Sequence, residues 1–117
     1  AEVKSLSEIS NEMRDLAARA RSKRLAPHEY QGGATSISNL GMFGIDSFDA
    51  VINPPHSSIL AVGCAGKKPI VKDDAIKIAT MMGATLSCDH RVIDGALGAE
   101  LLAAFKAYLE DPVTMLV

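Results

Sequence analysis

The chain contains no tryptophan, and aromatic residues make up only 4% of its 117 residues. Its core must therefore be built from aliphatic and small apolar side chains. Because the hydrophobic fraction is 48%, the composition is that of a globular chain and not of a disordered one. A chain of this length forms one domain at most, which excludes a multidomain architecture.

Cysteines, charge of one sign and long hydrophobic runs are also scarce. Cys64 and Cys88 have no Cys-x-x-Cys or zinc-finger spacing, which argues against disulfides or structural zinc and favours a reducing compartment. The formal net charge of -2 and the mixing of basic with acidic residues argue against a nucleic-acid partner. No apolar run approaches the roughly 20 residues that cross a bilayer, and the opening residues do not resemble a signal peptide.

Apolar periodicity predicts a helix, several strands and a second helix. The first helix should begin after Ser5, which has capping-box spacing to Glu8, and should end near Arg24. A short helical turn follows at residues 27–29. We expect strands at 34–40, 58–65, 69–72 and 75–88, with turns at 66–68 and 73–74 and an irregularity at Gly83. The last helix should span residues 94–111, giving an α+β layered fold with an antiparallel or mixed sheet.

Polar residues crowd the predicted junction between the last strand and the last helix, at residues 87–95. Two carboxylates and an arginine surround His90, which makes it a candidate general base. Asp94 also fits a helix N-cap, and Asp89 with Arg91 fits a structural ion pair.

Two other interpretations of the residues around His90 are weaker. A pair of Cys88 and His90 on one strand face would supply a thiol nucleophile and a base, but it lacks a third orienting group. A metal site at residues 88–90 is disfavoured, because neighbouring residues rarely converge on one ion. His28 and His56 are interpreted as surface or loop residues.

The segment Asp89-His90-Arg91-Val92-Ile93-Asp94-Gly95 resembles the D-H-R-x-x-D-G signature of the lipoyl-dependent acyltransferases of 2-oxoacid dehydrogenase complexes. Residues 32–45, 52–55 and 59–63 resemble the same family in the same order, so the resemblance covers essentially the whole chain. It is closest to the acetyltransferase core of pyruvate dehydrogenase complexes. It implies a CoA-dependent, chloramphenicol acetyltransferase-like fold, incomplete here, with residues 1–117 as the C-terminal half of the catalytic domain.

This resemblance implies acetyl transfer between coenzyme A and a dihydrolipoyl group carried on an absent domain, with no cofactor bound covalently in this segment. His90 matches the general base, Ser38 the serine that stabilises the tetrahedral oxyanion, and Asp94 the second carboxylate of the motif. A thiol with a pKa of about 8.5 needs such a base at neutral pH. Ser36 should share a strand face with Ser38 and is the competing oxyanion donor. The motif is shared with succinyl and branched-chain members, and residues 39–44 favour acetyl.

Two further expectations concern contacts and assembly. Met42 and Phe43 are weak candidates for substrate contact. Family resemblance implies trimers in which the serine of one subunit faces the histidine of its neighbour, and trimers that build a cubic or dodecahedral core. The lipoyl domain, pyruvate dehydrogenase and dihydrolipoamide dehydrogenase would act through absent domains, in the bacterial cytoplasm or the mitochondrial matrix. The alternative is a noncatalytic assembly module that oligomerises through exposed apolar surface.

Overall fold

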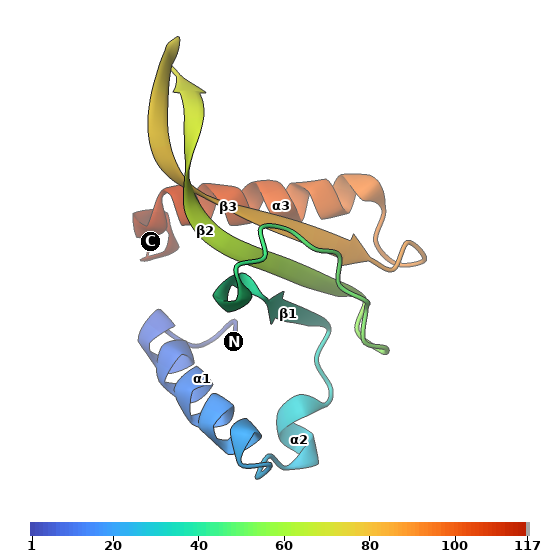
Figure 1. The fold of residues 1–117 in the computed structure, drawn as a ribbon. Helices are drawn as coiled ribbons and strands as arrows, with labels where there is room; N and C mark the ends of the chain where they lie inside the picture. Colours follow the sequence, from blue (N-terminus) through green and yellow to red (C-terminus); the bar gives the residue numbers. More distant parts are fainter. Residues whose placement is uncertain (117) are drawn as a thin grey trace. The chain divides into compact units, whose positions relative to one another are not determined.

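The computed structural model describes residues 1–116 and divides the chain into two units, with the boundary in the sequence between Gly33 and Ala34. The first unit holds two helices and the second holds a three-stranded sheet with further helices (Figure 1). No helix within residues 1–116 is long and apolar enough to cross a membrane. In chain order the elements are α1 (Leu6–Arg21), α2 (Pro27–Tyr30), β1 (Thr35–Asn39), η1 (Gly41–Phe43), β2 (Ser58–Lys72), β3 (Ala75–Cys88), α3 (Gly95–Glu110) and η2 (Pro112–Leu116).

The first unit begins with the predicted capping box. Ser5 Oγ accepts a hydrogen bond from the Glu8 backbone N–H at 3.2 Å, and the Glu8 carboxylate accepts one from the Ser5 N–H at 2.7 Å. The helix ends at Arg21, three residues before the predicted end. Lys23 takes a positive φ of 57°, which is incompatible with a continuing helix and explains the early end.

The sheet of the second unit has the order β1-β2-β3 and is mixed, as predicted. β1 runs parallel to β2, and β2 runs antiparallel to β3. Along β1 the side chains of Ser36 and Ser38 are half-buried, whereas those of the alternate residues, Thr35, Ile37 and Asn39, are exposed. The expectation that these two serines share a face of the strand is therefore confirmed.

β2 continues without interruption through residues 66–68, so the prediction of a turn between two shorter strands there is wrong. Lys67, for example, pairs with Thr80 in the antiparallel ladder. The long strand β3 offers a pairing partner throughout this stretch, and that pairing overrides the local turn signal of the Gly-Lys-Lys sequence. The reversal occurs where it was predicted, at Asp73 and Asp74, whose φ angles of 52° and 60° suit a tight hairpin.

The connection between β1 and β2, residues 40–57, passes very close to the sheet. The Cys64 N–H donates to the carbonyl oxygen of Ile45 at 2.8 Å. A Cβ built on Gly63 would lie 2.0 Å from the carbonyl oxygen of Asp46, and one built on Gly83 would lie 2.9 Å from the same atom. The β2-β3 register shifts just here, which confirms the irregularity expected at Gly83. Figure 1 shows the green connection passing over β2 in this view.

The buried part of the second unit is small. Ile59 and Ala61 are 8% and 2% exposed, and Ser58 is buried beside them. Many large apolar side chains are exposed instead, in the outer part of the hairpin and along α3; they include Val71, Ile76, Ile78, Leu97 and Leu101. Residues 1–116 therefore present apolar surface that they do not themselves cover.

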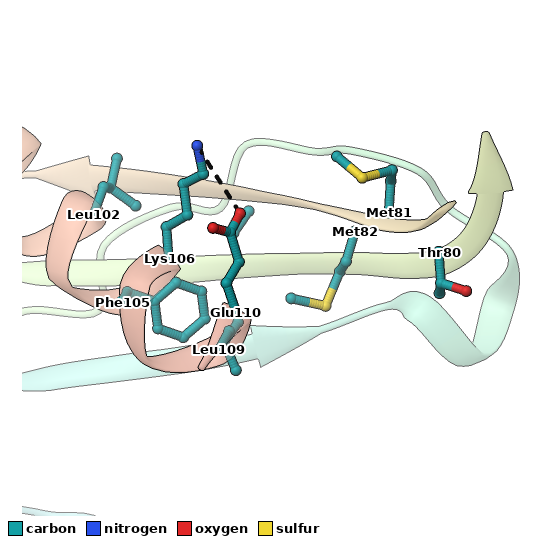
Figure 2. Close-up of a pocket in the computed structure, with 9 residues that line it drawn as sticks. Thr80, Met81, Met82, Leu102, Phe105, Lys106, Leu109 and Glu110 are labelled. Carbon is teal, nitrogen blue, oxygen red and sulfur yellow. Dashed lines mark ion pairs between the residues drawn. The ribbon is translucent and has the colours of Figure 1, made fainter. Parts of the chain in front are cut away.

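α3 lies against β3 and leaves a hollow near its C-terminal end. The hollow has a volume of about 380 Å³. Met82 from β3 and Phe105 and Leu109 from α3 are among the residues that line it (Figure 2). Lys106 and Glu110 form a 4.0 Å ion pair across one turn of the helix, on the rim of the hollow.

We predict that Gly63→Ala lowers the free energy of unfolding by about 2 to 3 kcal/mol, because the added methyl group overlaps the Asp46 carbonyl and forces the connection off the sheet. Urea unfolding measures the loss. Gly66→Ala is the matched control, since a Cβ there meets nothing within 4 Å. It should leave stability unchanged or raise it by about 0.5 kcal/mol. Equal effects of the two substitutions would contradict the close crossing.

Candidate active site

His90 lies on a turn between β3 and α3, at the strand-to-helix junction predicted from the sequence. The carbonyl oxygen of Asp89 accepts from the Val92 N–H at 3.0 Å, which closes the turn. The Asp89 N–H donates to the Ser57 carbonyl at 2.8 Å and ties the turn to the start of β2. Because His90 follows the end of the strand, the expectation that it shares a strand face with Cys88 is wrong. Its side chain is exposed.

Asp94 caps the helix that follows the turn, which confirms the N-cap interpretation. Its Oδ1 accepts from the Leu97 N–H at 2.8 Å. A carboxylate is favourable at this end of a helix, because the N–H groups of the first turn are unpaired and the helix dipole is positive there. α3 then packs closely on β3, since a Cβ built on Gly98 would lie 3.3 Å from Cys88 Sγ. Thus the cap and the glycine fix the helix relative to the His90 turn.

Asp89 and Arg91 form the predicted ion pair. Arg91 Nε and Nη2 donate to the two oxygens of Asp89 at 3.0 and 2.8 Å. The side-chain hydrogen bonds from Arg91 hold the pKa of Asp89 at about 2, and the pKa of Arg91 is raised in turn. Asp89 is therefore ionised and engaged at neutral pH, and it is a poor candidate for a proton carrier beside His90.

Two hollows meet at His90. The larger, which we call the His90 groove, has a volume of about 670 Å³ and is lined by residues 52, 54–56 and 88–91. The second, about 380 Å³, lies between the turn and α3 and includes both His90 and Asp94 in its lining. The imidazole of His90 is thus accessible from two sides, as a base that serves a substrate must be.

His56 is the groove residue that sequence reasoning missed. It lies in a loop, as expected, but it is half-buried and its Nδ1 makes a hydrogen bond with Ser36 Oγ. It lines the groove together with Pro54, Pro55 and the His90 turn, and the bond from the Asp89 N–H to the Ser57 carbonyl holds the two segments side by side. Those prolines restrict the backbone directly before His56 and were the one local signal that its position is fixed.

Ser38 and His90 do not meet within one chain. Ser38 on β1 pairs with Ala61 on β2, and Ala61 pairs with Thr85 on β3, so Ser38 and Thr85 are two strand spacings apart. Cys88 lies three residues further along β3. With strands about 4.8 Å apart and a rise of about 3.3 Å per residue, the Cα atoms of Ser38 and Cys88 are about 14 Å apart. His90 lies beyond Cys88, so a hydrogen bond between Ser38 and His90 of the same chain is excluded.

Met42 and Phe43, the weak substrate-contact candidates, lie on η1. They are 79% and 71% exposed, and neither lines the His90 groove. Their side chains are available for contacts outside the chain.

Cys64 is held away from the site. Its Sγ donates to Asp46 Oδ1 at 3.2 Å, and this hydrogen bond together with burial raises the pKa of the thiol. A protonated thiol is a weak nucleophile, so Cys64 is poorly suited to covalent catalysis. Within residues 1–116 no group of three or more His, Cys, Asp or Glu side chains is arranged to hold a metal ion.

The match to a family model decides the family. Residues 1–117 match the model described as 2-oxoacid dehydrogenases acyltransferase (catalytic domain). The chain belongs to this acyltransferase family. The resemblance inferred from the His90 motif is thereby confirmed.

Relatives and solved structures agree with this assignment. The chain is 59% identical over 117 residues to the dihydrolipoyllysine-residue acetyltransferase component of the pyruvate dehydrogenase complex from Rhizobium meliloti, and covers 26% of that protein. It is 52% identical over 120 residues to a mitochondrial counterpart from Arabidopsis thaliana, of which it covers 22%.

Two solved structures have the same fold as this chain. A structure of the cubic core of the pyruvate dehydrogenase multienzyme complex aligns with a TM-score of 0.92 and 36% identity, over 98% of this chain and 47% of that one. A structure of Azotobacter vinelandii dihydrolipoamide acetyltransferase aligns with a TM-score of 0.91 and 36% identity, over 98% and 47%. The α+β fold is thus that of the CoA-dependent acyltransferases, and the chain spans less than half of these solved chains.

We predict that Arg91→Gln raises the pKa of Asp89 from about 2 toward its ordinary value of 3.8, because the two guanidinium hydrogen bonds are lost. Carbon NMR of the carboxyl group measures both midpoints. A lowered native pKa means that the ionised pair stabilises the fold above the unfolded pKa, and that this contribution is lost as the pH falls through the native pKa. An unchanged midpoint in the variant would show that Arg91 is not the cause.

Proposed function

We propose that this chain is the C-terminal half of the catalytic domain of a dihydrolipoamide acetyltransferase, residues 1–117, and that it carries the base of the reaction. The reaction is transfer of an acetyl group between coenzyme A and a dihydrolipoyl group, with His90 as general base and Ser38 as oxyanion donor. Support comes from family membership and from the accessible position of His90 at the meeting of two hollows.

The observation that carries the proposal is a matching set of spacings. The Azotobacter structure comes from an investigation of the catalytic mechanism of that protein. The residues whose role was investigated are a serine, a histidine and an asparagine, at its positions 558, 610 and 614. The serine precedes the histidine by 52 positions, and the asparagine follows it by 4. In this chain Ser38 precedes His90 by the same 52 positions, and Asp94 follows it by the same 4. Ser36, the competing donor, does not fit this spacing.

His90 can perform the proton transfer that thioester exchange requires. A thiol with a pKa of about 8.5 is mostly protonated at neutral pH, and a neutral imidazole can accept its proton. The thiolate attacks the carbonyl carbon of the acetyl thioester and forms a tetrahedral oxyanion. The oxyanion collapses and expels the second thiolate, which takes the proton back from the imidazolium.

Ser38 would act on the oxyanion of a neighbouring protomer. The strand register separates Ser38 from His90 within one chain, so a shared site requires a second copy. A hydroxyl that donates to a developing oxyanion contributes about 2.7 to 4 kcal/mol in comparable acyl-transfer sites. The trimer proposed from the family resemblance supplies this arrangement, since each interface brings one serine to one histidine.

Asp94 would hold the His90 turn and α3 in place without carrying a proton. The side-chain oxygen that caps α3 is present in aspartate and in asparagine alike. Asparagine is the residue named at the corresponding spacing in the Azotobacter protein, where it cannot exchange protons as a carboxylate does.

The substrates and partners proposed for the full protein follow its relatives. Several are named as the acetyltransferase component of the pyruvate dehydrogenase complex, which favours acetyl as the acyl group and coenzyme A and dihydrolipoamide as the thiols. A large core built from trimers is supported by the likeness to a cubic core. The lipoyl domain, pyruvate dehydrogenase and dihydrolipoamide dehydrogenase would contact other segments. The compartment stays a prediction of bacterial cytoplasm or mitochondrial matrix.

A noncatalytic assembly module is the second candidate. The exposed apolar side chains of the β2-β3 hairpin and α3 favour association, with or without chemistry. Assembly in the absence of acetyl transfer by the full-length polypeptide would favour this candidate.

We predict that His90→Ala and Ser38→Ala each lower acetyl transfer by about 10² to 10³-fold or more in the full-length polypeptide. Mixing the two inactive variants before assembly should restore activity. If sites form between neighbouring protomers, about one quarter of the sites in an equal, random mixture pair an intact His90 with an intact Ser38. Transfer from acetyl coenzyme A to dihydrolipoamide is the assay.

The mixing experiment also tests the alternatives. Activity that stays absent after confirmed mixing would contradict a site shared between protomers. High activity of His90→Ala alone would overturn the base assignment. Cys88→Ala should retain transfer, and its inactivity would favour the cysteine-dependent mechanism instead.

Asp94→Asn and Asp94→Ala separate capping from proton transfer. We expect Asp94→Asn to keep both stability and acetyl transfer close to wild type, because asparagine caps as well as aspartate does. Asp94→Ala should lower the free energy of unfolding by about 1 kcal/mol through loss of the bond to the Leu97 N–H. Urea unfolding and the transfer assay measure the two effects. A loss of activity in Asp94→Asn as large as in His90→Ala would give Asp94 a direct role in catalysis.

A further inference from the structure

We propose that His56 is a substrate-binding residue of the His90 groove, where it forms a hydrogen bond with the amide of a thiol substrate. This inference rests on the proposed function, since it assumes that the groove beside His90 receives the thiol. It adds a recognition contact to the reaction without adding a second base.

Ser36 fixes the orientation of the His56 ring. Its Oγ makes a hydrogen bond with Nδ1, and both side chains are half-buried. The backbone before the ring is also anchored, because the His56 N–H donates to the Asn53 carbonyl at 2.9 Å. An imidazole held at one nitrogen presents the other in a defined direction, so it is already arranged for binding before a ligand arrives.

The second ring nitrogen, Nε2, has no hydrogen-bond partner among the residues that the structure describes. Since His56 lines the His90 groove, that nitrogen is available to a ligand in the groove. If the hydroxyl of Ser36 donates to Nδ1, Nε2 carries the proton and donates; if Nδ1 donates to the hydroxyl, Nε2 accepts. An amide satisfies either case, because it offers a carbonyl oxygen and an N–H.

The walls of the groove fit an aliphatic arm with one polar group. Ile52, Pro54 and Pro55 supply apolar surface near His56, and His90 on the neighbouring turn also lines the groove. Both thiol substrates of the proposed reaction have this form. Coenzyme A ends in an amide-linked aminoethanethiol arm, and dihydrolipoamide carries its amide at the far end of an alkyl chain. The shared chemistry is a thiol on a flexible chain that contains an amide.

The charged groups beside His56 do not supply the contact. Asp89 and Arg91, which also line the groove, are bound to each other through two side-chain hydrogen bonds. An exposed, self-paired ion pair has little attraction left for a neutral amide. The neutral hydrogen-bonding capacity of His56 is the feature that matches an uncharged substrate arm.

Two substitutions separate substrate contact from structural anchoring. The amide of asparagine reaches the place of Nδ1, and that of glutamine reaches the place of Nε2. His56→Asn therefore keeps the Ser36 contact and loses the groove contact, whereas His56→Gln keeps the groove contact. In the full-length, assembled polypeptide, we expect His56→Asn to raise the KM of one thiol about 3- to 10-fold, the range for one neutral hydrogen bond. Its kcat should stay within about twofold, and His56→Gln should have a KM close to wild type.

Varying coenzyme A and dihydrolipoamide separately identifies which thiol carries the recognised amide. His28→Asn is the matched control, because His28 is exposed in α2 of the first unit and should leave both KM values unchanged. Wild-type KM values in His56→Asn, or an impaired His56→Gln beside a normal His56→Asn, would overturn the proposal. A lowered kcat with unchanged KM would overturn it too. Failure of the wider function is distinguishable, since it would appear as retained activity in His90→Ala.

Discussion

The connection that carries His56 is held against the sheet by the close passage of a backbone carbonyl over a glycine. The carbonyl oxygen of Asp46 occupies the space that a Cβ of Gly63 would need, at 2.0 Å from its ideal position. The adjacent bond from the Cys64 N–H to the Ile45 carbonyl holds the connection against β2. At its far end the connection is held again, because the Ser57 N–H donates to the Ala34 carbonyl at 2.9 Å. His56, directly before Ser57, lines the groove.

The His90 turn, which also lines the groove, is positioned by a sequence of local constraints. β3 ends at Cys88, the turn is closed by bonds to the Asp89 carbonyl, and Asp94 caps the helix that follows. The bond from the Asp89 N–H to the Ser57 carbonyl joins this turn directly to the segment that carries His56. Both segments that flank His90 are thus fixed. Its side chain is exposed, as the proposed role of general base requires.

Separation of Ser38 from His90 within the chain explains why association matters for the proposed chemistry. The sheet is rigid on the scale of a strand, so a small motion cannot bring these two side chains together across two strand spacings. The exposed apolar residues of the hairpin and α3 give a second reason for association, since their burial is favourable by about 25 cal/mol per Å² of apolar area. Under the proposal, the same contacts that remove this surface from water would complete the site.

The sequence by itself determined the features that depend on residues close together in the chain. Four such features could be predicted, since each arises from neighbouring residues. They are both helix caps, the turn at Asp73 and Asp74, the His90 junction and the Asp89–Arg91 pair. The family was also predictable, from motifs that are short and in a fixed order.

Only the tertiary structure decided the features that depend on pairing across the chain. β2 continues through residues 66–68 because β3 pairs with it there, against the local turn signal. His56 became a groove residue because Ser36, twenty positions earlier, binds its ring. The distance between Ser38 and His90 follows from the order of three strands, which no local pattern encodes. The physical reason is that local backbone preferences act over a few residues, whereas sheet pairing and loop crossing are decided by distant partners.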